Sequence, residues 1–226
     1  TSVRDVDELV LLDIAATIEK RGPQLDLIRR VSETCFVPLA YGGGIASIEH
    51  ARSCIDAGAE RVIVSSAAIL NREPVGLIVE RIAKEYGSNA VTASVDFMRD
   101  AGALKVAVRS GTLLTSMTAQ EWAKIAVKRG AGEILLQSID RDGTLEGYDL
   151  DAITSVREAV PDVRLIASGG CGSYEHMAQA LDAGADAVAA GAMWTFTDST
   201  PQGARAYLQE HGYDVRPPMR PMERAK

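Results

Sequence analysis

The sequence predicts an α/β protein in which parallel strands and helices alternate, and three observations lead to this fold class. Short apolar runs alternate along the chain with segments whose apolar residues recur at helical spacing. The short runs are almost continuously apolar, which is typical of a parallel sheet that is covered on both faces. Residues 43–62 recur in altered form as residues 169–188, which indicates that one half of the chain duplicates the other.

Each short apolar run predicts one strand, and the longer segments between the runs predict helices. The parallel strands are expected at 8–14, 36–41, 61–65, 90–96, 133–139, 164–167 and 186–190. Leu25, Ile28 and Val31 share one face of a predicted helix, and Ser47 and Ser173 each stand where a helix begins. Residues 105–108 and the turn after them depart from the alternation and predict a small hairpin.

The internal repeat specifies the architecture. At an offset of 126 residues, ten of twenty positions are identical without a gap: Gly43/Gly169, Gly44/Gly170, Ser47/Ser173, Glu49/Glu175, His50/His176, Asp56/Asp182, Ala57/Ala183, Gly58/Gly184, Ala59/Ala185 and Val62/Val188. Four βα units per half, taken twice, give a (βα)8 TIM barrel built from two duplicated half-barrels. Because only seven strands can be counted, we expect the first βα unit, roughly 30 residues long, upstream of Thr1.

No linker or charge block divides the chain, so one barrel domain is expected over residues 1–214. The segment 215–226 is rich in Pro and Arg, and a disordered tail is expected there.

Composition limits the function classes. The chain has 226 residues, a formal net charge of -7, 46% hydrophobic and 24% charged residues, as in an ordinary globular protein. The acidic balance argues against nucleic acid as a partner, and no apolar run is long enough to cross a membrane. The three cysteines are too widely spaced for a disulfide framework or a metal site, which favours a reducing cytoplasm. No cofactor motif is found, so neither a metal nor a cofactor is expected.

Each half carries a glycine-rich turn followed by a strand that ends on small residues, and together they predict one phosphate cradle per half. The first cradle consists of Gly43, Gly44, Ser65 and Ser66, and the second of Gly169, Gly170, Gly191 and Ala192. Two cradles on opposite sides of the barrel mouth would suit an elongated substrate with a phosphate at each end. The alternative is that the glycines only serve tight turns.

Carboxylates stand where barrel strands are expected to end, which is the catalytic end of this fold. Asp96 is the candidate acid or base, and the alternative for Asp96 and Asp13 is a helix cap or a loop-ordering contact. Asp142 and Gly143 form a turn that can face a ligand, although Asp142 could simply cap this turn.

Other polar positions point to structural roles. Charged residues stand at the starts of three expected strands: Glu8, Arg61 and Glu133. At this end of a barrel such residues usually serve stability, and the alternative is that a ring of charges gates a passage. His50, His176 and Trp122 are predicted to be structural, because they lie on expected outer helices.

Six motifs taken together resemble the cyclase subunit of imidazole glycerol phosphate synthase. They are Asp-Glu-Leu-Val-Leu-Leu-Asp-Ile (7–14), Tyr-Gly-Gly-Gly-Ile (41–45), Gly-Ala-Gly-Glu-Ile-Leu-Leu (130–136), Ser-Ile-Asp-Arg-Asp-Gly-Thr (138–144), Gly-Tyr-Asp (147–149) and Ala-Ser-Gly-Gly-Cys-Gly (167–172). The likeness covers nearly the whole chain, to about residue 216, and the 138–144 motif is highly specific to that family.

The resemblance implies a half-barrel duplication, a bisphosphate substrate and a glutaminase partner at the N-terminal face of the barrel. Ammonia from the partner crosses the barrel and reacts with phosphoribulosyl-formimino-AICAR phosphate, giving imidazole glycerol phosphate and AICAR. Two aspartates carry the acid–base work in that family: one matches Asp96, and the other lies on a first strand that this sequence does not contain. Glu8, Arg61 and Glu133 match three of the four residues of the family's ammonia gate.

Two departures keep other functions open. Ser65 and Ser66 replace the usual Asn and Thr or Ser, and Tyr41 replaces the usual Val. Together with Ala190-Gly-Ala-Met-Trp (190–194), they are similar to a paralogous branch that delivers ammonia to surface-polysaccharide sugars. A barrel that only binds phosphates and a partner is a third alternative.

Overall fold

The computed structural model describes residues 6–70 and 75–216. The strands are β1 Leu9–Leu12, β2 Leu39–Gly42, β3 Arg61–Val64, β4 Val91–Asp100, β5 Ala103–Val108, β6 Leu113–Thr118, β7 Glu133–Ser138, β8 Arg164–Ser168 and β9 Ala187–Val188. The helices are α1 Leu25–Ser32, α2 Ile48–Asp56, α3 Ser66–Leu70, α4 Leu77–Tyr86, α5 Ala119–Lys128, α6 Leu150–Ala159, α7 Tyr174–Asp182, α8 Ala192–Phe196 and α9 Pro201–Glu210, with a 3-10 turn at Ser88–Ala90.

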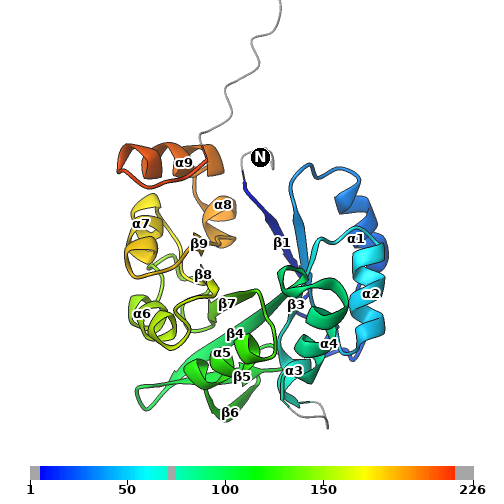
Figure 1. The fold of residues 1–226 in the computed structure, drawn as a ribbon. Coiled ribbons are helices and arrows are strands. Elements are labelled where there is room, and N and C mark those ends of the chain that lie inside the picture. Colours follow the sequence, from blue (N-terminus) through cyan, green and yellow to red (C-terminus); the bar gives the residue numbers. More distant parts are fainter. Residues whose placement is uncertain (1–5, 71–74, 217–226) are drawn as a thin grey trace, which may run out of the picture.

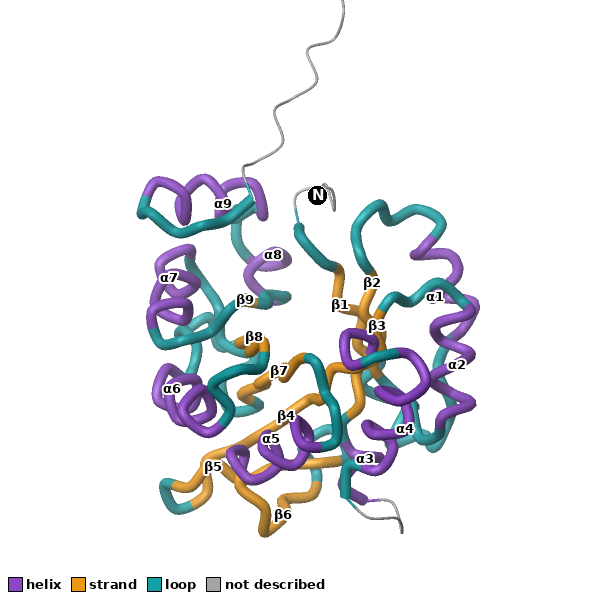
Figure 2. Tube along the Cα trace, viewed as in Figure 1, coloured by secondary structure: helices purple, strands orange, loops and turns teal. Residues whose placement is uncertain are grey.

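The parallel strands follow one another in the order β1-β2-β3-β4-β7-β8-β9, and β5 and β6 branch from β4 as an antiparallel hairpin. The sheet curls, with its strands on the inside and helices around the outside (Figures 1 and 2). The predicted TIM-barrel architecture and the hairpin are confirmed. Within the described residues β1 and β9 do not pair with each other, and the position of a first βα unit stays a prediction.

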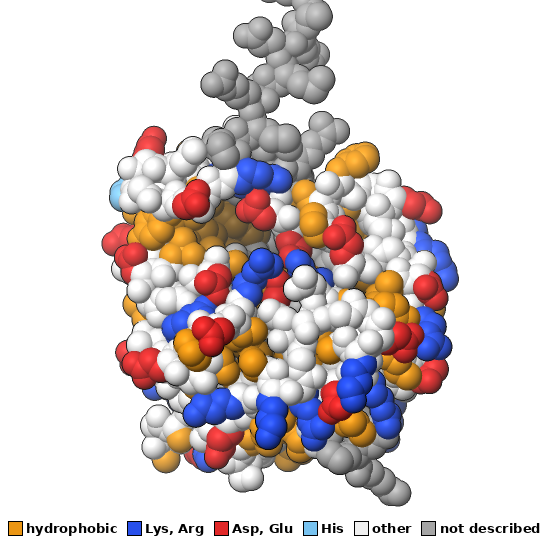
Figure 3. All heavy atoms as spheres, viewed as in Figure 1, with side chains coloured by type: hydrophobic (Ala, Val, Ile, Leu, Met, Phe, Trp, Pro, Cys, Tyr) orange, Lys and Arg blue, Asp and Glu red, His pale blue; other side chains and the backbone are white. Residues whose placement is uncertain are grey.

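The surface is hollowed where the two ends of the sheet face each other. Figure 3 shows this hollow between the α9 side and the β1 side, with hydrophobic side chains on its wall. Phe196 of the short helix α8 is 75% exposed.

All seven parallel strands differ from their predicted bounds by one residue or more, and β2, β9 and β4 show how. β2 begins at Leu39 because Pro38 has no N–H to donate, and its carbonyl accepts from Leu9 N at 2.9 Å. β9 is only two residues long, although Ala189 N still donates to Ala167 O. β4 runs four residues beyond Asp96, because its end pairs with β5.

The two faces of the sheet bury different apolar clusters. The larger cluster joins strand residues to helix residues such as Ile28, Ile82 and Trp122, so it lies between sheet and helices. The smaller cluster contains strand residues alone, so it fills the inside of the barrel; it consists of Ala40, Ile63 and Leu135, with Val10 and Ile166 packed against them.

Strand register divides the barrel interior into levels. Neighbouring strands pair Thr92 with Glu133 and Glu133 with Arg164, which sets the floor of the barrel. Four residues later along β4, Asp96 pairs with Gln137, and Gln137 with Ser168, which sets the mouth. Because side chains two residues apart share a face of a strand, the floor and mouth residues line the same interior.

The duplication is visible in helix capping. The Ser47 hydroxyl accepts from His50 N, and the Ser173 hydroxyl accepts from His176 N, with almost the same backbone angles. A serine N-cap satisfies one of the free donors at the start of each helix. The two repeat copies therefore fold in the same way.

No helix among the described residues is both long enough and apolar enough to span a membrane. Of the predicted tail, residues 217–226 lie outside the described part of the chain.

Candidate active site

Asp96 stands at the barrel mouth and is held by two hydroxyl groups. Ser65 Oγ donates to Asp96 Oδ2 at 2.6 Å, and Ser94 Oγ donates to Asp96 Oδ1 at 2.5 Å. Burial raises the pKa of the Asp96 carboxyl, and the two hydroxyl hydrogen bonds oppose this shift. No ion pair to Asp96 is present among the described residues. A carboxyl whose pKa is moved toward neutrality is suited to proton transfer.

The alternative of a helix cap does not hold for Asp96. Asp96 lies inside β4, and the following helix α5 is capped by Thr118 in a capping box with Glu121. Among the described residues the Asp96 carboxylate accepts from two serine hydroxyls and from no backbone N–H of a helix.

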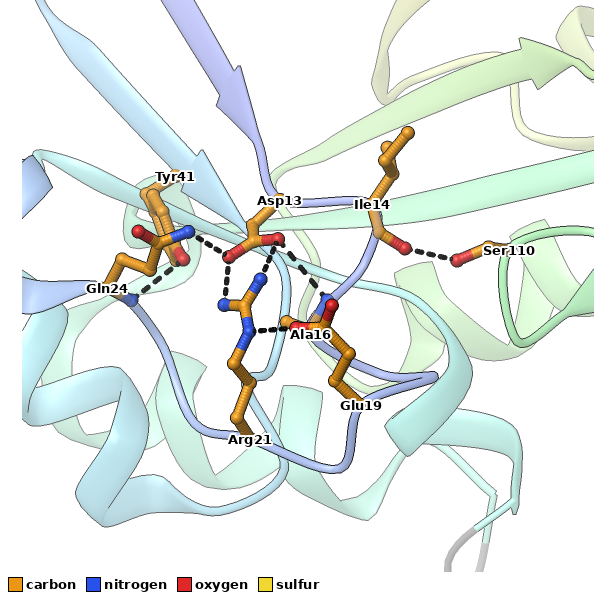
Figure 4. A network of polar contacts seen from close by, with 8 residues as sticks. All are labelled: Asp13, Ile14, Ala16, Glu19, Arg21, Gln24, Tyr41 and Ser110. Atoms are coloured by element: carbon orange, nitrogen blue, oxygen red, sulfur yellow. Dashed lines mark hydrogen bonds and ion pairs between the residues drawn. The ribbon is translucent and has the colours of Figure 1, made fainter.

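Asp13 has the opposite environment. Arg21 binds both of its oxygens, Gln24 Nε2 donates to Oδ2 at 2.7 Å, and Ala16 N donates to Oδ1 at 3.2 Å (Figure 4). The Arg21 hydrogen bonds lower the pKa of Asp13 to about 2. Asp13 is therefore an ionised carboxylate that orders the loop between β1 and α1. This is the loop-ordering contact that the sequence offered as the alternative to an acid–base role.

The turn after β7 presents Asp142 and Gly143 to solvent. Both residues are exposed, and Gly143 has a positive φ of 79°. The turn is closed by Thr144, whose backbone N and Oγ1 both donate to Arg141 O. No hydrogen bond to the Asp142 carboxylate is found within the described residues. The Asp142 carboxylate is thus open to a ligand and does not cap its own turn.

The paired glycines of the two turns, Gly43–Gly44 and Gly169–Gly170, are required by the protein's own backbone. Gly44 and Gly170 have φ values of 71° and 101°. A Cβ on Gly44 would lie 2.7 Å from Arg21 O, and one on Gly170 would collide with Gly147 O. Each glycine turn therefore packs against the βα loop that precedes it, so the tight-turn interpretation is satisfied whether or not phosphate binds. Gly43 and Gly169 likewise meet backbone carbonyls.

The strand ends beside these turns differ in how open they are. Ser66 is the first residue of α3, and its Oγ accepts from Arg109 N at 2.8 Å. Ala192 is the first residue of α8, and a Cβ on Gly191 would meet no heavy atom within 4 Å. The second cradle therefore has free space at this position, whereas the first is covered by the β5–β6 turn. The sequence predicts this hairpin but gives no sign that its turn lies at the site.

The three predicted gate residues meet at the barrel floor. Arg61 forms an ion pair with Glu8, and its Nε lies 3.6 Å from Glu133 Oε2. Thr92 Oγ1 also donates to Glu133 Oε2, at 3.1 Å. Burial raises the pKa of Glu8, although Arg61 opposes the shift. The structure brings Glu8, Arg61 and Glu133 together at the floor, and their role as a gate stays a prediction.

The sequence reasoning missed a fourth charge in this cluster. Arg164 Nη1 donates to Glu133 Oε1 at 2.6 Å, so the buried Glu133 carboxylate has an arginine on each oxygen. Arg164 also begins a strand, as Arg61 and Glu133 do, which is the signal that could have identified it.

His50 and His176 have equivalent structural positions. Ala46 N donates to His50 Nδ1 at 3.3 Å, and Gly172 N donates to His176 Nδ1 at 3.2 Å. Trp122 is fully buried, and its Nε1 donates to Ser94 O at 2.9 Å. In residues 6–70 and 75–216, no three His, Cys, Asp or Glu side chains gather as a metal site.

Comparison with known proteins decides the family. A family model described as "Histidine biosynthesis protein" matches residues 2–199. The chain belongs to this histidine biosynthesis family. Proteins named imidazole glycerol phosphate synthase subunit HisF are 42% identical in Exiguobacterium sibiricum, 43% in Chlorobium luteolum and 41% in a Thermotoga strain. Each alignment covers 93% of this chain, and 82%, 82% and 81% of the respective relatives.

Membership of the histidine biosynthesis family agrees with the fold and with the resemblance carried by the six motifs. The matched region 2–199 contains the floor cluster, Asp96 and both glycine turns.

Proposed function

We propose that this chain is the cyclase subunit of imidazole glycerol phosphate synthase. It uses ammonia to convert phosphoribulosyl-formimino-AICAR phosphate to imidazole glycerol phosphate and AICAR. The observation that carries the proposal is the position of Asp96: a partly buried carboxyl with a raised pKa at the mouth of a barrel whose two halves each carry a glycine turn.

Asp96 performs the acid–base work that the reaction requires. Ring closure around an incoming ammonia needs protons to leave nitrogen and to reach departing groups. The hydroxyls of Ser65 and Ser94 fix both carboxylate oxygens, and burial keeps the proton affinity of the carboxyl high. A positioned carboxyl of this kind contributes typically 10²–10⁴-fold to the rate.

The two cradles hold the two phosphates of the substrate. In the first half the ligands are backbone N–H groups at Gly43 and Gly44 and the hydroxyl of Ser66. Ser65 joins them once its hydroxyl hydrogen turns from Asp96 to the phosphate. In the second half they are backbone groups at Gly169, Gly170, Gly191 and Ala192, with the Asp142–Gly143 turn beside them. Backbone donors explain how a chain with a net charge of -7 can take an anionic substrate.

The floor cluster forms the gate through which ammonia enters the barrel, and a glutaminase partner docks at this N-terminal face. The cluster joins two carboxylates, Glu8 and Glu133, to two guanidinium groups, Arg61 and Arg164. Two carboxylates and two guanidinium groups have no net charge together. Their ion pairs can therefore break and re-form as ammonia passes while the cluster as a whole stays neutral. The reducing cytoplasm is the compartment that fits the three free cysteines.

The test is turnover of the aminoimidazole bisphosphate by the full-length protein with ammonium chloride as the nitrogen source. We expect imidazole glycerol phosphate and AICAR in equal amounts, and glutamine as a nitrogen source once the glutaminase partner is added. A folded protein without turnover would reject the proposal and favour the ammonia-delivering paralogue.

A further inference from the structure

The turn between β5 and β6 lies over the first cradle and is fixed there by two hydrogen bonds. Arg109 N donates to Ser66 Oγ at 2.8 Å. Ser110 Oγ donates to Ile14 O at 2.6 Å, which ties the turn to the loop after β1 (Figure 4). A short turn with these two anchors has little freedom to move away from the mouth.

Backbone strain marks the same turn. Arg109, Ser110 and Gly111 follow one another with φ values of 53°, 54° and 81°. Left-handed backbone costs about 1 kcal/mol or more at each residue that is not glycine, and such residues concentrate at functional sites. The turn thus keeps an arginine and a serine where glycines would be less strained.

The Arg109 guanidinium has no partner among the described residues, whereas other arginines near the mouth are held in ion pairs. Arg21 is bound to Asp13 and Glu19, and Arg99 is bound to Asp149. Arg109 is exposed and forms no side-chain hydrogen bond or ion pair with the described residues. An uncompensated guanidinium therefore belongs to the turn that covers the first cradle.

Ser66 connects this cation to the ligand position. Its Oγ uses a lone pair to accept from Arg109 N, so its own O–H hydrogen remains available for a ligand. An anion that accepts this hydrogen is adjacent to the Arg109 backbone and within the range of its long side chain.

We infer that Arg109 is a phosphate ligand of the first cradle: its guanidinium binds the phosphate group that the Ser66 hydroxyl also contacts. The inference rests on the proposed function in taking this cradle as a phosphate site. Guanidinium groups bind phosphate through paired, charge-assisted hydrogen bonds, which supply affinity that backbone donors alone lack.

The experiment titrates inorganic phosphate into the isotope-labelled full-length protein and follows backbone amide signals by NMR. Arg109→Gln removes the charge, and Arg109→Lys keeps it. Arg30→Gln is the matched control, because Arg30 is an exposed arginine on α1. Signals of Gly43, Gly44 and Ser66 report the first cradle, and those of Gly170 and Gly191 report the second.

In Arg109→Gln we expect phosphate to bind about ten-fold more weakly at the first cradle and with unchanged affinity at the second. Arg109→Lys should retain part of the affinity, and Arg30→Gln all of it. Equal affinity of Arg109→Gln and the unchanged protein at the first cradle overturns the inference, as does an absence of phosphate binding there. If the protein does not turn over the bisphosphate but Arg109→Gln still weakens phosphate binding at the first cradle alone, the proposed reaction is rejected and Arg109 remains a phosphate ligand.

Discussion

Asp96→Asn separates the chemistry of the mouth from the stability of the fold. The substitution keeps the size of the side chain and removes its ability to carry a proton. We expect the turnover number with saturating ammonium to fall by about 10²–10⁴-fold, which corresponds to about 2.7–5.5 kcal/mol of lost transition-state stabilisation.

The structure indicates that stability changes much less. Asp96 accepts one hydroxyl hydrogen on each oxygen. Asn keeps one acceptor, and its amide N–H can donate to the other serine once that hydroxyl rotates. The cost of this exchange is about 1 kcal/mol, and it is offset because no buried carboxylate remains to be ionised.

The pH dependence has a definite sign. Because burial raises the pKa of Asp96 above 3.8 in the folded state, folding favours the protonated carboxyl. Asp96 therefore stabilises the fold most at a pH below the unfolded value, and this contribution is lost as the pH rises through the folded pKa. Asp96→Asn should become more stable relative to the unchanged protein over that window.

The assay is steady-state turnover with ammonium, combined with thermal unfolding at several pH values. Asp56→Asn, an exposed aspartate at the end of α2, is the isosteric control. Asp96 is not the acid or base if Asp96→Asn keeps more than a tenth of the turnover number while unfolding like the unchanged protein.

The remaining predictions concern the loop after β1, the floor and the N-terminal face. Because Arg21 holds the pKa of Asp13 near 2, this contact stabilises the fold above pH 4, and the stabilisation is lost as the pH falls toward 2. Asp13→Asn should lower the free energy of unfolding by about 1–2 kcal/mol at neutral pH. The free energy of unfolding of this variant should also depend less on pH between 4 and 2. Glu133→Gln leaves two arginines without their shared carboxylate, so chemical denaturation should show a loss of about 3 kcal/mol, and glutamine-dependent turnover should change more than ammonium-dependent turnover. An equal effect on both nitrogen sources would count against the gate. Phe36, 83% exposed just before β2, should anchor the glutaminase partner: Phe36→Ser should weaken its binding about ten-fold in a titration and leave ammonium-dependent turnover unchanged, and unaltered affinity would remove Phe36 from the interface.

Sequence reasoning located the elements because each strand is a short apolar run, a signal that depends only on neighbouring residues. It could not give the length of β9, since only Ala187 and Val188 pair with β8, and apolar content does not report pairing. Phe36 is apolar and is therefore included in the predicted strand 36–41. It lies outside β2, because the strand begins only after Pro38.

The sequence could predict that Asp96 and the glycine turns lie at the mouth, because each follows a short apolar run, although β4 continues past Asp96. The roles of these residues in catalysis and phosphate binding stay predictions. Arg164 was missed because its contact with Glu133 depends on the register of two strands 31 residues apart. Arg109 was missed because a hairpin places it against Ser66, 43 positions earlier in the chain. The different environments of Asp13 and Asp96 likewise depend on partners that spacing does not reveal.

The hydrogen bond from Ser65 to Asp96 has a consequence for how such a barrel could have arisen. Asp96 belongs to the second repeat copy, whereas Ser65, which orients one of its oxygens, belongs to the first. The serine caps and the histidine contacts of the glycine turns, in contrast, are each completed within a single copy. An ancestral half would therefore have had its complete glycine turn by itself, but a carboxyl with both oxygens held exists only where the two halves meet. Joining the two halves into one polypeptide would have kept Ser65 beside Asp96 permanently. Selection could then have favoured the fusion for the oriented carboxyl as well as for stability.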